Sequence, residues 1–165
     1  TKGASAFVNI LSNGIGADQA NELIAIMASK PNLKTLCGFS GDETELDLSN
    51  KGLSTGCGVL VANEVKNNGA LVKFDISKNK LYAAGGKALA EALDGNQVMT
   101  ELNLAGNSLG LVKRKGAADM SGVTAVSDAI PTMGALTSLN LASNCLGAEG
   151  ATHFAEAIKG HVSAM

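Results

Sequence analysis

One pattern, LxxLxLxxNxL, recurs in LVKFDISKNKL (71–81), MTELNLAGNSL (99–109) and LTSLNLASNCL (136–146), and less closely in ETELDLSNKGL (43–53). Asn79 and Asn107 occupy the same position of the pattern and lie 28 residues apart, and Lys51 lies another 28 residues upstream. Self-similarity at a fixed period of this length is the signature of a repeat architecture, in which each unit is one supersecondary element. The chain is therefore predicted to be an array of repeats.

The apolar centre of each motif predicts a short strand. Successive side chains of a strand point to opposite faces, so the two apolar residues of each LxL face inward. These pairs are Leu46/Leu48, Phe74/Ile76, Leu102/Leu104 and Leu139/Leu141. Helical patterns follow, most clearly in GKALAEALD, where Leu89 and Leu93 lie one turn apart. We expect an opening strand over 7–15 and helices over 16–29, 56–67, 86–94, 123–130 and 147–160. Neighbouring units would complete one another's core.

This motif, this period and a helix in every repeat resemble the leucine-rich repeat family, and most of all its ribonuclease-inhibitor-like branch. The resemblance implies an α/β fold: a right-handed leucine-rich repeat solenoid, or horseshoe, with a concave parallel sheet and convex helices. It extends over nearly the whole chain. We therefore expect a single leucine-rich repeat domain (1–165) of about five repeats.

The pattern is broken in several places. A partial unit near 33–42 begins a motif but ends before reaching an Asn, and an inserted loop (111–120) separates a strand from the next helix. Lys51 stands in the Asn column, where an amine cannot supply an amide acceptor, so we expect this turn to be satisfied differently, with Asn50 as a candidate. The chain stops at Met165 without a following strand, and we expect a fragment or an incomplete C-terminal cap.

An Asn recurs where the chain leaves each strand, at Asn13, Asn79, Asn107 and Asn144. An Asn amide at such a bend can donate and accept hydrogen bonds with backbone groups that the bend leaves unpaired. Because buried polar groups in native proteins are paired, this column is predicted to be a structural Asn ladder.

The residues between the leucines face outward and form columns across the repeats. The third motif position holds Glu45, Lys73, Glu101 and Ser138. The fifth position holds Asp47, Asp75, Asn103 and Asn140. Adjacent strands lie about 4.8 Å apart, so Asp47 and Asp75 should be neighbours of like charge, which is destabilising unless it is offset. Lys73 and Lys78 are the near candidates for that offset.

Two interpretations of this outward face remain open. It is either a solvated, self-neutralised surface, since exposed ion pairs contribute little, or an acidic patch for a basic element of a partner. The partner-binding residues predicted on it are Glu45, Asp47, Lys73, Asp75, Lys78, Glu101 and Asn103. A dense basic run, Lys113, Arg114 and Lys115, lies in the inserted loop and is either solvated or a second docking site.

Composition narrows the class of partner. A net charge of −2 argues against a surface built to neutralise phosphates, so protein partners are expected rather than nucleic acid. Three cysteines at unrelated spacings indicate neither a disulfide framework nor a metal cluster. They favour buried thiols in an intracellular reducing compartment, either the cytoplasm or an organelle reached after removal of a targeting segment. No apolar stretch approaches the roughly 18 residues of a membrane span.

The catalytic inventory is small. His153 and His161 are the two histidines, and no recognisable motif places a Ser or Cys beside them. No catalytic residue, cofactor or metal site is predicted. The leading hypothesis is a non-catalytic protein–protein interaction module that binds through the concave sheet and the basic loop. The alternatives are a structural accessory subunit of a larger multi-protein assembly, and a GTPase-activating protein, an activity that the ribonuclease-inhibitor-like resemblance implies without matching any catalytic residue here.

Overall fold

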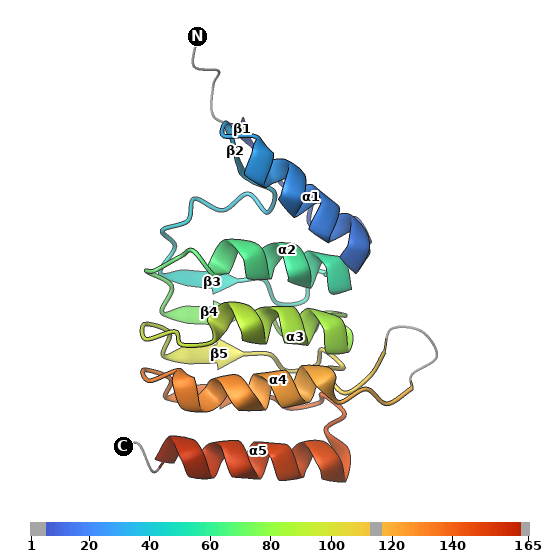
Figure 1. The fold of residues 1–165 in the computed structure, drawn as a ribbon, viewed down its shortest axis with the longest axis vertical. Helices are drawn as coiled ribbons and strands as arrows, with labels where there is room; N and C mark the ends of the chain where they lie inside the picture. Colours follow the sequence, from blue (N-terminus) through green and yellow to red (C-terminus); the bar gives the residue numbers. More distant parts are fainter. Residues whose placement is uncertain (1–5, 113–116, 163–165) are drawn as a thin grey trace.

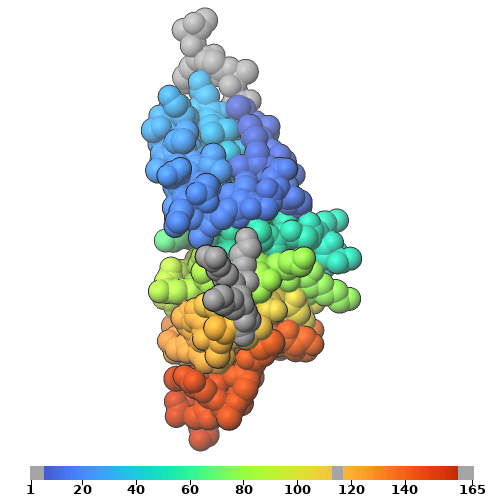
Figure 2. Space-filling model, turned by 90° about the vertical axis from the view of Figure 1, so that its right-hand side faces the viewer, coloured from blue at the N-terminus to red at the C-terminus, as the bar shows by residue number. Residues whose placement is uncertain are grey.

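The computed structural model describes residues 6–112 and 117–162. Its units follow one another in chain order along the long axis of the molecule (Figures 1 and 2). The strands are β1 (Ala6–Phe7), β2 (Leu33–Thr35), β3 (Glu45–Asp47), β4 (Lys73–Asp75), β5 (Glu101–Asn103) and β6 (Ser138–Asn140). The helices are α1 (Ala17–Ser29), α2 (Thr55–Val65), α3 (Tyr82–Leu93), α4 (Ser121–Ala129), the short 3-10 helix η1 (Ile130–Thr132) and α5 (Gly147–Val162).

The strands form two parallel sheets. β3, β4, β5 and β6 pair in that order, and β1 pairs with β2 in a separate sheet. In the larger sheet, equivalent motif positions lie side by side, so that Glu45 pairs with Lys73, Lys73 with Glu101, and Glu101 with Ser138. Parallel pairing and the alternation of strands with helices agree with the prediction. The expected single sheet is divided into two, because β2 and β3 do not pair.

The core lies between the larger sheet and the helices, which stack beside it (Figure 1). Phe74 of β4 is at most 1% exposed, as are Ile76 and Leu104, which directly follow β4 and β5. Leu46 of β3 and Leu139 of β6 are only half-buried. Among the described residues, each of these two strands has a neighbouring strand on one side alone, so its inward side chains lack one of the two layers that cover the central ones.

Small residues let successive helices approach closely. A Cβ atom at Gly122, at the start of α4, would lie 2.7 Å from the Cα atom of Ala83 in α3. Only glycine fits at this contact without a backbone shift. Helix α3 begins at Tyr82, four residues before the predicted start at 86, and this first turn packs among the starts of α2 and α4.

The partial unit is where the repeat order fails. β2 is followed by a connection over 36–44 that contains no helix, and the chain then enters β3. Helix α1 nevertheless packs directly on α2. The helices therefore stack continuously past a point at which the strands separate. None of the helices in the described ranges combines the length and the apolar character needed to cross a bilayer.

The cysteines differ in their surroundings. Cys37 and Cys57 are buried, whereas Cys145 is exposed, so the predicted burial is wrong for Cys145. It lies in the turn after β6 with a φ of 57°, and no strand in the described part of the chain lies beyond β6 to cover it. Burial, reinforced by the charge of Glu64, raises the pKa of the Cys37 thiol far above its ordinary value.

Candidate functional site

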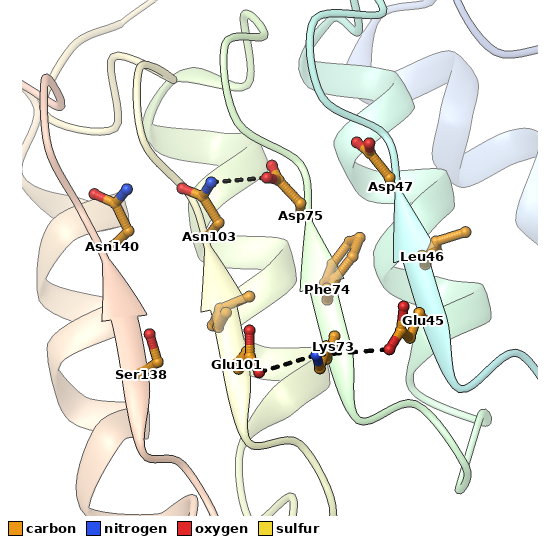
Figure 3. A pocket seen from close by; sticks show the side chains of 11 residues that line it. Glu45, Leu46, Asp47, Lys73, Phe74, Asp75, Glu101, Asn103, Ser138 and Asn140 are labelled. Atoms are coloured by element: carbon orange, nitrogen blue, oxygen red, sulfur yellow. Dashed lines mark hydrogen bonds and ion pairs between the residues drawn. The ribbon is translucent and has the colours of Figure 1, made fainter.

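The outward face of the larger sheet is hollowed into a groove of about 600 Å³, which we call the sheet-face groove (Figure 3). Its polar lining residues are Glu45, Asp47, Lys73, Asp75, Glu101, Asn103, Ser138 and Asn140. They come from the third and fifth motif positions of four consecutive strands. Sequence periodicity and parallel register are therefore sufficient to bring these residues together.

The third-position column forms an ion-paired row. The Nζ atom of Lys73 lies 3.2 Å from Oε1 of Glu101 and 3.6 Å from Oε1 of Glu45. The hydrogen bond and charge of Glu101, followed by the charge of Glu45, raise the pKa of the Lys73 amine. All three side chains are substantially exposed, so this row contributes little to stability.

The fifth-position column closes each strand with the same turn. The Oδ1 atom of Asp47 accepts the backbone N–H of Ser49 at 2.8 Å, and that of Asp75 accepts the N–H of Ser77 at 2.8 Å. The asparagines of the next two strands accept equivalent bonds from Ala105 and Ala142, at 3.2 and 3.1 Å. Aspartate and asparagine are thus interchangeable as turn formers here, and the negative charge of the aspartates is a separate property.

Asp47 and Asp75 are direct neighbours in the register of β3 and β4. Asp75 also accepts a hydrogen bond from Nδ2 of Asn103 at 2.8 Å (Figure 3). Hydrogen bonds from Ser49 lower the pKa of the Asp47 carboxyl. Within residues 6–112 and 117–162, neither aspartate forms an ion pair.

Neither Lys73 nor Lys78, the lysines suggested as an offset, forms an ion pair with these aspartates among the described residues. Beside the hydrogen bonds from Ser49, it is the charge of Lys51 that helps to lower the pKa of Asp47. Lys73 pairs with the two glutamates, because they occupy its own column. Lys78 is exposed in the turn after β4, with a φ of 57°, and does not line the groove. The charged residues of the sheet-face groove are one lysine and four carboxylates, which leaves a net charge of −3.

Three members of the Asn column are buried between units. Nδ2 of Asn79 donates to the carbonyls of Leu48, Ile76 and Ser77, and its Oδ1 accepts the N–H groups of Lys51 and Leu53. Asn144 makes the equivalent contacts to the preceding turn, accepting from the N–H groups of Asn107 and Leu109. Each such amide joins two successive units through their backbones.

Asn107 follows this arrangement only in part. Its Nδ2 donates to the carbonyls of Ile76 and Leu104, but its buried Oδ1 has no partner among the described residues. The preceding turn, after β4, takes a different path from the others. Its second left-handed residue is Tyr82, with a φ of 55°, whereas in the units of Asn107 and Asn144 it is the residue directly after the Asn.

The first two positions of the column behave differently. Asn13 is exposed, and its Nδ2 donates to carbonyls of its own turn, those of Ile10 and Leu11. Lys51 stands where an Asn would connect its unit to the preceding one, and at this place two serine hydroxyls form the connecting hydrogen bonds. Ser12 Oγ donates to the Lys51 carbonyl and Ser54 Oγ to the Ile15 carbonyl, both at 2.7 Å. Serines, rather than the suggested Asn50, therefore connect these units.

A second polar cluster, which the sequence did not indicate, lies at the partial unit. Thr35 is 1% exposed, and its Oγ1 donates to Oε2 of Glu64 at 2.6 Å. The same Oγ1 accepts the N–H groups of Cys37, Gly38 and Phe39. Oε1 of Glu64 accepts the N–H groups of Leu36 and Cys37 at 2.6 and 3.0 Å. This Thr35–Glu64 network ties the end of β2 to α2.

The connection between β2 and β3 is organised by Glu43. Its carboxylate accepts the N–H groups of Ser40 and Gly41, and Nδ2 of Asn68 donates to its backbone carbonyl. Partial desolvation acts to raise the pKa of Glu43, but the hydrogen bonds from Ser40 and Gly41 outweigh it and lower the pKa.

Folding should therefore weaken in acid through Glu43. A carboxyl whose pKa is lower in the folded state contributes stability above its unfolded pKa and loses it as the pH falls through the folded value. We expect the free energy of unfolding to fall between roughly pH 5 and pH 3, and to fall less steeply in Glu43→Gln. Urea unfolding at several pH values measures this difference, and parallel pH profiles for the two proteins would contradict it.

Lys113, Arg114 and Lys115 lie outside the described residues. His153 lies partly exposed on α5, away from the groove lining. Within the described ranges, no three side chains of His, Cys, Asp or Glu gather closely enough to hold a metal ion.

Comparison with known families agrees with this geometry. Residues 95–111 and 136–155 match a family model described as "Leucine Rich repeat". The first match spans β5 and the turn after it, and the second spans β6 and the start of α5. No curated protein matches the chain. The two matched repeats support a leucine-rich repeat protein; such domains generally mediate protein–protein interaction and are typically non-catalytic.

Proposed function

We propose that the chain is a non-catalytic interaction module that binds a basic element of a protein partner through the sheet-face groove. The observation that carries this proposal is the unbalanced charge of the groove. Its one lysine is already shared between two glutamates, while neither Asp47 nor Asp75 forms an ion pair in the described part of the chain, although the charge of Lys51 acts on Asp47. Neighbouring like charges are unfavourable in the free protein, and a partner's cation would relieve their repulsion.

The acidic side chains of the groove are also pre-organised for binding. The side chains of Asp47 and Asp75 are fixed by hydrogen bonds to the turns that follow their strands, at Ser49 and Ser77. Binding would therefore cost little additional side-chain ordering. The sheet beneath is rigid, because Asn79 and Asn144 lock successive turns together. A pre-ordered acidic surface suits a lysine- or arginine-bearing segment.

The wider architecture belongs to this proposal as well. The 28-residue period and the helix that follows nearly every strand support the ribonuclease-inhibitor-like branch and a right-handed solenoid forming one domain. As a second candidate, the half-buried Leu139 and Leu141 support an accessory subunit in which the side of β6 away from β5 packs against another protein. Chemical crosslinking of the native assembly separates that role from reversible binding.

Substituting Asp47 and Asp75 by asparagine tests the groove. Asparagine already forms the same turn at Asn103 and Asn140, so the double variant should fold. Relief of the repulsion between the two aspartates should raise its stability, and loss of the bond that Asp75 Oδ2 accepts from Asn103 should reduce that gain. We expect recovery of the partner that co-purifies from the native source to fall about two- to tenfold, an effect that added salt should reproduce in the wild type. Quantitative pull-down at matched protein concentration measures it.

Asp128→Asn is the matched control, because it removes an exposed charge on α4 rather than on the sheet. It should leave recovery unchanged. Unchanged recovery by the Asp47/Asp75 double variant, together with raised thermal stability, would show that the acidic pair is only a solvated surface.

A further inference from the structure

We propose that the free edge of β3 receives an extended basic segment of the protein partner as an added parallel strand, with the pattern basic–apolar–basic. This inference rests on the proposed function, since it specifies how the partner of the sheet-face groove enters. Its starting point is the division of the strands into two sheets. β3 pairs with β4 on one side and has no strand on the other within the described ranges (Figure 3).

The backbone groups on that edge are available. The carbonyl of Thr44 and the N–H groups of Leu48 and Asn50 bond toward β4 and the turn after it. In a parallel strand the residues that bond to one neighbour alternate with those that bond to the other. The N–H and C=O groups of Glu45 and Asp47 therefore point away from β4. Outside strand pairing, no hydrogen bond of the described residues uses them.

The preceding strand is prevented from filling this edge. β2 pairs with β1, and the Thr35–Glu64 network takes up the N–H groups of the residues that follow β2. The chain then leaves through the connection that Glu43 organises. The opening beside β3 is thus fixed by hydrogen bonds to a carboxylate on α2, and it is not a frayed strand end.

A cavity with both polar and apolar lining residues lies beneath the same edge. It has a volume of about 150 Å³, and its apolar lining includes Met27, Phe39, Leu46 and Val65. Leu46 is half-buried, whereas the equivalent Phe74 and Leu102 are 1% and 4% exposed. A strand added beside β3 would direct its middle side chain to this side, next to Leu46. A single apolar residue there would complete the layer that covers the central strands.

The charges of β3 indicate that the residues on either side of the apolar one in the added segment are basic. Glu45 and Asp47 both face the groove, and the residues beside them in a parallel neighbour would be the two that flank its apolar one. Lysine or arginine at those places would extend the row of Glu45, Lys73 and Glu101 by one alternating charge and would give Asp47 a partner. A second copy of β3 would instead bring acidic residues together.

The other free edge of the larger sheet does not share these properties. Within residues 6–112 and 117–162, β6 also lacks a neighbouring strand on one side, but its outward residues are the neutral Ser138 and Asn140. By the same alternation, the N–H groups of Leu139 and Leu141 point to that edge. These two N–H groups provide an internal control for non-specific binding of the peptide to strand edges.

The test is an NMR titration of the labelled protein with a capped peptide of sequence Thr-Lys-Leu-Lys-Leu-Ser. We expect amide shifts at Glu45 and Asp47, slowed hydrogen exchange of both, and no slowing at Leu139 or Leu141. Methylating the backbone nitrogen of the first leucine, which would donate to β3, should weaken binding about three- to tenfold. Methylating the nitrogen of the first lysine, which would face away, should not.

Two protein variants separate the edge from the groove. Glu45→Gln and Glu45→Pro both remove the carboxylate, but only proline also removes the outward N–H, at an edge position where proline is tolerated. We expect proline to weaken peptide binding about three- to tenfold beyond glutamine. Circular dichroism of both variants checks that the fold is kept, and the methylated peptides apply the same test to the unaltered protein.

The outcomes distinguish the two proposals. Shifts spread over Lys73 and Glu101, with equal effects of glutamine and proline and of both methylations, would support binding to the groove and overturn the added strand. Weakening by the lysine methylation alone would overturn the parallel arrangement, because it is the antiparallel one that turns that N–H toward β3. Protection at β6, dimerisation in place of peptide binding, or no binding of the unmethylated peptide would each overturn the inference.

Discussion

Replacing Asn79 with alanine is expected to lower the free energy of unfolding by about 3 kcal/mol. Asn79 is 6% exposed and connects the turns that follow β3 and β4. Its partners are the carbonyls of Leu48, Ile76 and Ser77 and the N–H groups of Lys51 and Leu53. Alanine would leave these buried backbone groups without a partner and would open a small cavity between two units. Urea unfolding followed by circular dichroism measures the change.

Asn13→Ala is the matched control for Asn79→Ala. Asn13 has the same place in the motif, but it is exposed and donates only to carbonyls of its own turn. Its replacement should cost about 1 kcal/mol or less, because water can satisfy the groups that it leaves. Similar losses for the two variants would mean that the position in the motif, and not the connection between units, determines the contribution.

Thr35→Val is expected to destabilise the fold by about 2 to 4 kcal/mol. Valine has nearly the shape of threonine, so packing is retained while the hydroxyl is lost. The Oγ1 atom accepts three backbone N–H groups and donates to Glu64, all in a region where Thr35 is 1% exposed. Removing it would leave the end of β2 unsatisfied, and we expect hydrogen exchange to accelerate first at 36–39.

The control is Thr137→Val, which removes the hydroxyl of an exposed threonine that donates a single bond to the Thr100 carbonyl. It should change the free energy of unfolding by less than about 1 kcal/mol. Glu64→Gln tests the same network from α2 and should also destabilise, because it weakens the acceptor for the N–H groups of Leu36 and Cys37. Wild-type stability in both network variants would contradict this account of the partial unit.

Much of the larger sheet could be predicted from residue order. The inward leucines and the outward columns follow from a period of two within each strand and 28 between units, and the register of β3, β4 and β5 matches them. The pairing of Lys73 with Glu45 and Glu101 also follows, since residues at the same motif position lie side by side on neighbouring strands. These contacts could be predicted because, in a repeat array, each unit contacts only the units next to it.

The joint at the partial unit could not be predicted in this way. Aligned on the motif, Thr35 falls in the column of Glu45 and Lys73, whose side chains are exposed, yet it is buried and bonded to Glu64. Glu64 lies 29 residues away on α2, and no repeat relates the two positions. The exposure of Cys145 could not be predicted from the sequence either, and nor could the serine hydrogen bonds that connect the units at Lys51. Both depend on which unit packs against the turn in three dimensions.

The sequence by itself determined the repeat, the inward and outward sides of each strand and the residues that the sheet displays, because regular backbone geometry converts spacing directly into position. Only the tertiary structure decided where the sheet is interrupted and that β3 has a free edge among the described residues. That outcome depends on a competition for the backbone N–H groups that follow β2, which the Glu64 carboxylate and the Thr35 hydroxyl take up. The outcome of this competition depends on which groups are close together in three dimensions, and it is not reflected in the periodicity of the sequence.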